Sequence, residues 1–106
     1  MEREEKLYIA THPIRLKILK ILEKEEPLYV NQIVERLRNE GVDVDRKLVS
    51  YHLSRLLQYG LVEGEFRLLN PHPLNDYAVR SYNIAVKYFR LTDEARKILL
   101  QISKSL

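Results

Sequence analysis

The segment from Arg46 to Val62, RKLVSYHLSRLLQYGLV, constrains the fold of this chain more than any other segment. An α-helix turns by about 100° per residue, so the apolar side chains of this segment gather on one helical face. That face consists of Val49, Leu53, Leu56 and Leu57. Asp45 is a good N-cap for this helix. Gly60 suits the left-handed residue that follows a helix, and Leu61 is placed to fold back on Leu56. The sequence therefore predicts an amphipathic helix over about residues 46–59.

The opposite face of this helix carries cations, hydroxyls and an amide, but no carboxylate. Its residues are Lys47, Tyr51, Ser54, Arg55 and Gln58. A helix that only faces solvent usually mixes both signs of charge, and this chain is rich in glutamate. The acid-free face therefore indicates contact with a polyanion. A solvated face that happens to lack acids is the alternative interpretation.

The charge distribution along the chain agrees with a polyanionic partner. The net charge of the 106 residues is +3. Residues 1–45 carry 8 Lys and Arg against 10 Asp and Glu, whereas residues 46–90 carry 7 against 3 and residues 91–106 carry 3 against 2. Positive charge is thus concentrated on the central helix and the segment that follows it.

Length and composition limit the protein to a small number of classes. With 106 residues, we expect one domain over residues 1–106 with a modest core. The absence of cysteine excludes disulfides, thiolate metal sites and thiol catalysis. No apolar run approaches the roughly 18 residues that span a bilayer, and the charged start MEREEK does not resemble a signal peptide. We therefore expect a soluble, cytoplasmic protein without membrane contact.

Two further helices are predicted before the central one. Pro13 suits the first position of a helix, and the segment IRLKILKILEKEE continues it with a largely apolar pattern. The next helix covers about residues 31–40 and is closed by Gly41. Residues 41–45 then lead into the central helix. Two short amphipathic helices joined by a brief glycine-containing turn form a helix-turn-helix, in which the second helix is free to enter a major groove.

After Gly60 the pattern changes from helical to extended. Residues 61–69 and 82–91 are rich in Val, Ile, Tyr and Phe, which favour strands. Residues 70–81, NPHPLNDYAVRS, contain two prolines together with Asn and Asp, so we expect a long loop between the strands. The hairpin over about residues 61–91 is the wing of a winged helix, and the predicted fold class is α+β.

The two ends of the chain are predicted to form helices that join two copies of the protein. Residues 1–10 form a short helix, and Thr92 caps a last helix with an apolar stripe. Their apolar faces are more than one small domain easily covers, so we expect a homodimer. The residues assigned to dimerisation are Leu7, Ile9, Ile98, Leu99 and Ile102.

The segments HPIRLKILKIL and VSYHLSRLLQYGLVE resemble the ArsR-type winged-helix repressors of bacteria and archaea. The first is similar to the opening helix of that family, and the second to its recognition helix and the entry to its wing. The resemblance covers most of residues 12–69. It implies a dimeric, DNA-binding transcriptional regulator. By position, it implies groove-facing roles for Lys47, Ser50, Tyr51 and Ser54.

The chain departs from the metal-sensing members of that family. Where they carry a Cys-Val-Cys signature, this chain has Tyr29, Val30 and Asn31, so the soft thiolate ligands are absent. The last helix lacks histidine, which removes the alternative site of other members. The three histidines, at positions 12, 52 and 72, lie in separate elements without metal-ligand spacing. We expect neither a metal nor a cofactor.

The sequence also argues against an enzyme. Ser50 and His52 are two residues apart on a helix and point about 200° apart, so they do not form a nucleophile–base pair. Glu63 and Glu65 share a strand face, but nothing supplies the pocket that acid catalysis requires. The three glycines stand alone, so there is no phosphate-binding loop.

We assign DNA contact to residues of the central helix and of the hairpin. They are Arg46, Lys47, Ser50, Tyr51, Ser54 and Arg55 of the helix and Arg67, Arg80 and Lys87 of the hairpin. Hydroxyl groups near the middle of the helix are expected to read base edges, and these belong to Ser50, Tyr51 and Ser54. Cations are expected to contact phosphates, and these belong to Arg55, Arg67 and Arg80, while Lys47 suits either role.

A winged helix that serves as a protein interaction module in a larger complex is the alternative function. The fold alone does not decide between this function and DNA binding. The acid-free helix face and the cations of the hairpin favour DNA. Pairing of those cations with the acidic first half of a neighbouring chain would favour the interaction module.

Overall fold

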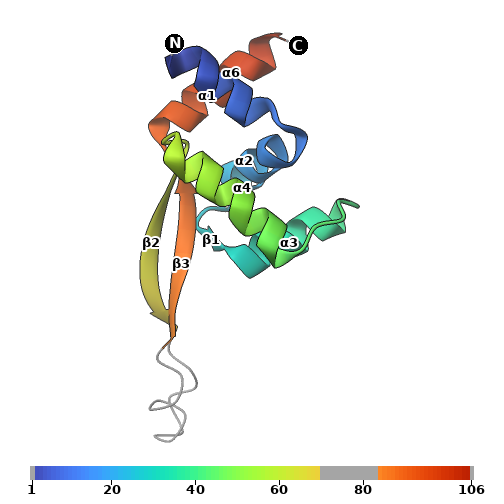
Figure 1. The fold of residues 1–106 in the computed structure, drawn as a ribbon, viewed down its shortest axis with the longest axis vertical. Coiled ribbons are helices and arrows are strands. Elements are labelled where there is room, and N and C mark those ends of the chain that lie inside the picture. Colours follow the sequence, from blue (N-terminus) through green and yellow to red (C-terminus); the bar gives the residue numbers. More distant parts are fainter. Residues whose placement is uncertain (1, 70–83, 106) are drawn as a thin grey trace, which may run out of the picture.

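The computed structural model describes residues 2–69 and 84–105, and it has the predicted α+β winged-helix fold (Figure 1). The expected loop over residues 70–81, with Arg80, lies outside the described residues. The elements in chain order are α1 (Glu2–Thr11), α2 (Pro13–Glu25), β1 (Leu28–Tyr29), α3 (Val30–Asn39), α4 (Arg46–Gln58), β2 (Val62–Leu69), β3 (Ile84–Leu91) and α6 (Asp93–Ser105).

The helix-turn-helix consists of α3 and α4, and hydrogen bonds fix the turn between them. Gly41 adopts the left-handed conformation with φ +83°, and the Val42 amide donates to the Leu37 carbonyl at 3.0 Å, as in a Schellman C-cap. Arg38 Nε donates to the Val44 carbonyl at 2.8 Å, and Val44 itself is buried in the core. The turn therefore holds α4 at a defined angle to α3.

Both ends of α4 are as the sequence predicts. The Asp45 carboxylate accepts a hydrogen bond from the Leu48 amide at 2.8 Å. At the other end, Gly60 has φ +69°, and the amide of the buried Leu61 donates to the Leu56 carbonyl at 2.9 Å. The recognition helix is thus delimited by residues within its own sequence neighbourhood.

The sheet has one strand more than the predicted hairpin. Strands β2 and β3 pair antiparallel, as expected, and the hairpin that they form extends away from the helices (Figure 1). The additional strand β1 pairs with the other edge of β3, placing Leu28 opposite Phe89 and Tyr29 opposite Tyr88. Two residues are too few to show the alternation that identifies a strand in a sequence.

The terminal helices α1 and α6 pack on the same core as α2 to α4, which corrects one expectation. Ile9, Ile98 and Leu99 are buried within their own chain. The expectation that one domain leaves these three side chains uncovered is therefore wrong, because neighbouring helices of the same chain cover them. Leu7 and Ile102 are only half-buried and pack at the margin of the core.

Candidate nucleic-acid interface

The predicted outer face of α4 is open to solvent. The exposed side chains of this helix are those of Arg46, Lys47, Leu48, Tyr51, Ser54 and Gln58, while Ser50 and Arg55 are half-buried. The inward face contains Val49, Leu53 and Leu56, as predicted, and also His52. Of the six residues of α4 that we assigned to DNA, all but two are therefore exposed, and none of the exposed residues of this helix is acidic.

Tyr51 has the largest exposed ring on this face. Its side chain is 56% exposed, and its ring meets the ring of the buried His52 edge-on, with centroids 5.2 Å apart. The contact supports the base of the ring while leaving more than half of the residue accessible. Tyr51 is thus both held in place and free to meet a partner.

Arg55 lies apart from the other assigned cations of α4. Its guanidinium lies 5.4 Å from the centroid of the Tyr59 ring and donates to the Gln58 side chain at 3.0 Å. It lines a shallow hollow of about 350 Å³ together with Glu4 and Tyr8 of α1. Arg46 and Lys47 lie at the opposite end of the helix. The structure therefore places Arg55 beside α1 and away from the first turn of α4.

The two assigned cations of the described wing lie on opposite faces of the hairpin. Arg67 lies 5.2 Å from the Tyr88 ring centroid and 3.5 Å from Glu65, which also pairs with Arg90 at 3.2 Å. Lys87 is opposite Phe66 in the ladder, so it occupies the other face. One flat surface cannot contact both Arg67 and Lys87.

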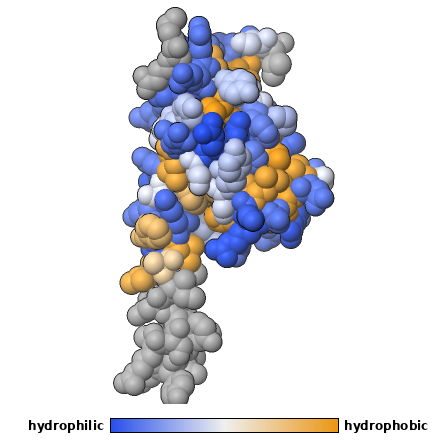
Figure 2. Space-filling model, in the orientation of Figure 1, coloured by the Kyte–Doolittle hydropathy of each residue, from blue (hydrophilic) through white to orange (hydrophobic). Residues whose placement is uncertain are grey.

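Lys87 is held between aromatic rings near the middle of the paired strands of the wing. Its ammonium nitrogen lies 5.5 Å from the Phe66 ring centroid and 5.6 Å from that of Phe89. Its aliphatic chain lies over Gly64, where a Cβ would collide with it. Phe66 and Leu68 on this face are both 67% exposed, and apolar surface is visible on the outer hairpin in Figure 2. Sequence reasoning missed this apolar face because the strand pairing decides which side chains share it.

A buried polar cluster lies beneath α4. Arg15 is 7% exposed and His52 is 4% exposed. Arg15 Nε donates to the Ile9 carbonyl of α1 at 2.7 Å, and Arg15 Nη1 lies 3.3 Å from His52 Nδ1. The His12 ring lies 4.7 Å from the His52 ring, and His12 Nδ1 accepts from the Ile14 amide at 3.2 Å. The cluster therefore connects α1, α2 and α4.

The protonation state of His52 follows from this environment. Burial, and then the nearby His12 and Arg15, lower the pKa of His52 to about 4. The imidazole is therefore neutral at pH 7. Because a guanidinium only donates hydrogen bonds, His52 Nδ1 accepts and the ring proton lies on Nε2. Sequence reasoning missed Arg15, although a cation within the apolar run of α2 is a signal that such a role exists.

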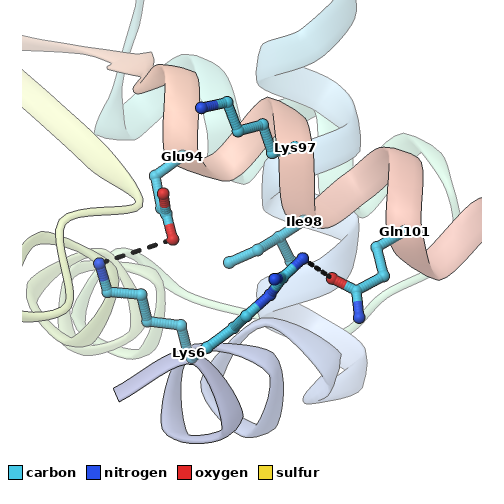
Figure 3. A pocket seen from close by; sticks show the side chains of 6 residues that line it. Lys6, Glu94, Lys97, Ile98 and Gln101 are labelled. Atoms are coloured by element: carbon cyan, nitrogen blue, oxygen red, sulfur yellow. Dashed lines mark hydrogen bonds and ion pairs between the residues drawn. The ribbon is translucent and has the colours of Figure 1, made fainter.

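A second hollow lies between α1 and α6, away from α4, and measures about 500 Å³. Figure 3 shows that two polar contacts bridge the helices beside Ile98. Arg3 donates to Gln101 at 3.1 Å, and Lys6 lies 3.8 Å from Glu94. These bridges explain how the two terminal helices close over Ile98 within one chain.

Residues 2–69 and 84–105 are the part of the chain that the structure describes. No group of three or more His, Asp or Glu side chains in this part of the chain is placed to hold a metal ion. None of the helices described there has the length and apolar character needed to cross a membrane.

Comparison with known proteins places these features in context. The model of the family described as "Bacterial regulatory protein, arsR family" matches residues 12–64, which is half of the chain. No curated protein sequence matches the chain.

Three solved structures illustrate the likeness of fold. A PadR family transcription regulator from Clostridium difficile R20291 has 22% identity and a TM-score of 0.62, over 87% of this chain and 83% of that one. A possible transcriptional regulator for arsenical resistance has 20% identity and a TM-score of 0.61, over 94% and 81%. A PadR family regulator from Eggerthella lenta DSM 2243 has 20% identity and a TM-score of 0.60, over 92% and 81%. At these identities the likeness shows the winged-helix fold.

Proposed function

Because the chain belongs to the ArsR family of bacterial regulatory proteins and is a DNA-binding transcriptional regulator, we propose that it recognises a specific duplex sequence by placing α4 in the major groove. The observation that carries this proposal is the exposed outer face of α4, which has cations and hydroxyls and no acid. Residues 1–106 act as one winged-helix domain in this proposal. Its place of action in this proposal is the cytoplasm.

The side chains of α4 fall into two groups, one that reads the base sequence and one that contacts phosphates. Tyr51 and Ser54 are exposed in the middle of the helix, where their hydroxyls reach base edges, with Ser50 at the margin of the face. Arg46 and Lys47 lie in the first turn, where cations suit phosphates. Arg55 contacts a phosphate only if its guanidinium leaves the Tyr59 ring, so it contributes least of the assigned cations.

The wing adds phosphate contacts. Arg67 is the assigned wing cation on one face of the hairpin, and Lys87 the assigned cation on the other. Arg67 is paired with Glu65 but its side chain is exposed, whereas Lys87 is half-buried between two phenylalanine rings, so Arg67 is the more accessible of the two to a phosphate. We assign the same role to Arg80, which lies outside the described residues.

Selection from random duplex DNA, followed by salt titration of the selected site, tests the function. We expect one enriched motif and a steep fall of affinity with salt, because each neutralised phosphate releases counterions. The absence of both an enriched motif and a steep salt dependence would instead support the winged helix as a protein interaction module.

Tyr51→Ala is expected to weaken binding to the selected duplex by about 1–3 kcal/mol, with little effect on random DNA. The reason is that an exposed ring in the middle of α4 reads bases and does not neutralise phosphate. Fluorescence anisotropy on both duplexes measures the difference. Tyr51→Phe keeps the ring against His52 and removes only the hydroxyl, so it separates the contribution of the hydroxyl from that of the ring. Equal losses of Tyr51→Ala on the two duplexes would show that the ring does not read sequence.

Arg67→Ala is expected to weaken binding to selected and random duplexes alike and to lower the salt slope by about one unit. A phosphate contact adds affinity without reading sequence, and Glu65 keeps Arg90 as a partner in this variant. Lys97→Ala, which removes one exposed positive charge from α6, is the control for net charge. If the two variants have the same salt slope, the wing does not contact phosphate.

We also infer that two copies assemble through α1 and α6 and bind a pseudo-palindromic site. Tyr8 on α1 and Leu100 on α6 are exposed large apolar side chains, and Leu7 and Ile102 are only half-buried. A dimer places two copies of α4 on successive half-sites. Sedimentation equilibrium at micromolar concentration is expected to give twice the 12.6 kDa mass of one chain. A mass of one chain under these conditions would contradict the dimer.

A further inference from the structure

Arg15 is the residue of α2 that connects the N-terminal helix to the recognition helix. Its side chain is almost fully buried. Nε donates to the Ile9 carbonyl near the end of α1 at 2.7 Å, and Nη1 lies 3.3 Å from His52 Nδ1 on α4. One rigid guanidinium therefore contacts two other helices at once.

This contact constrains α4 in a way that apolar packing does not. The hydrophobic effect is non-directional, so a small rotation of a helix on an apolar surface changes the energy of the contact little. Hydrogen bonds weaken steeply when their angle departs from linear, and the planar fork of arginine fixes the directions of its donors. A buried guanidinium that loses an acceptor also loses free energy, because it is cut off from water. Both acceptors must therefore stay where the fork points.

The constraint reaches the outer face of α4 through the residue next to His52. Tyr51 is adjacent in sequence, and its ring packs edge-on against His52. The His12 ring lies on His52 as well, and His12 itself caps the start of α2 through the Ile14 amide. A rotation of α4 that moves His52 away from Arg15 also moves Tyr51.

We propose that Arg15 is a positioning residue for DNA recognition: by holding His52 against the end of α1, it sets the orientation of α4 and hence the placement of Tyr51. The proposal rests on the proposed function, in which α4 reads the DNA sequence. It adds a residue that contacts no DNA and that lies on α2, outside the helix-turn-helix. It also makes the seating of α1 a determinant of sequence recognition.

The first test needs no DNA. Imidazole ¹⁵N NMR of the full chain at pH 7 is expected to show His52 with its proton on Nε2 and with Nδ1 hydrogen-bonded. In Arg15→Met, the Nδ1 resonance should move toward that of an unbonded ring, and the amide resonances around Tyr51 should shift while circular dichroism remains that of a folded protein. Unchanged α4 resonances in folded Arg15→Met would overturn the proposal.

The second test compares selected and random duplexes. Arg15→Met should lower affinity for the selected duplex at least tenfold and change affinity for random DNA less than twofold. His52→Leu should behave in the same way, whereas His52→Asn should retain most of the preference, because its side-chain oxygen keeps an acceptor near the position of Nδ1. Loss of a stable fold alone would reduce both affinities in proportion to the unfolded fraction. Equal losses on both duplexes in folded variants would therefore refute positioning.

The two tests separate this proposal from the function on which it rests. If the unaltered protein selects no duplex, the proposed function fails, and the NMR experiment still reports whether Arg15 orients α4. If the protein selects a duplex and the NMR spectrum of α4 does not respond to Arg15→Met, only the positioning role fails.

Discussion

Lowering the pH from 7 to 4 is expected to remove about 3 kcal/mol of folding free energy through His52. The folded protein holds the pKa of His52 at about 4, mainly through burial, against 6.5 for a free histidine. Between these two values the unfolded chain binds a proton that the folded chain does not bind. The stabilisation is therefore complete above about pH 6.5 and is lost as the pH falls toward 4.

Urea unfolding at pH 7, 6, 5 and 4 and at constant ionic strength measures this dependence. Burial and the nearby Arg15 also lower the pKa of His12, which changes stability in the same direction. The pKa of Glu25 is lowered by its hydrogen bonds with Arg36, and this carboxylate titrates in a lower range, below about pH 4.5. His52→Asn is therefore the reference, because it removes the His52 titration and keeps the other groups.

The difference between the two proteins isolates the contribution of His52. We expect the unaltered protein to lose clearly more stability than His52→Asn between pH 7 and pH 4. Parallel stability curves for the two proteins would mean that His52 is not buried as a neutral acceptor in solution. Arg15 would then have no fixed acceptor on α4.

The features that the sequence predicted correctly are those that depend on close neighbours in the chain. Asp45 caps α4 by accepting from the amide three residues downstream, and Gly60 with Leu61 closes the same helix. Gly41 ends α3 in the same way. A cap depends on backbone conformation and a few adjacent side chains, so a local pattern is enough to predict it.

The features that the sequence did not predict depend on contacts between distant segments. Strand β1 exists because β3, some sixty residues later, offers it a free edge. Arg15 is buried because α1 and α4 close over it, and its place in the apolar run of α2 does not say which residues it contacts. The separation of Arg67 from Lys87 follows from the register of β2 with β3. Hydrophobic periodicity carries no information on which elements meet.

The largest effect of a single substitution is expected at Ile98, where Ile98→Lys should cost on the order of 4 kcal/mol. Ile98 is 2% exposed and packs within its own chain under the bridges between α1 and α6. Three cations, Arg3, Lys6 and Lys97, line the hollow beside it together with one carboxylate, that of Glu94. A new ammonium there therefore meets a net positive charge in addition to the cost of burial. Domains of this size are stable by about 5–15 kcal/mol, so a loss of about 4 kcal/mol removes between about a quarter and most of the stability of the protein.

Ile102→Lys is the matched control, because it makes the same change one turn later on α6. Ile102 is half-buried at the margin of the core, so a lysine there can extend its ammonium into solvent. We expect a folded protein whose stability falls by about 1 kcal/mol and whose dimer is weakened. Urea unfolding and sedimentation velocity measure the two properties separately. A folded, stable monomer for Ile98→Lys would show that Ile98 belongs to a surface between two chains. A large loss of stability in Ile98→Lys together with a folded monomer for Ile102→Lys would place the boundary between core and interface on α6 between these two residues.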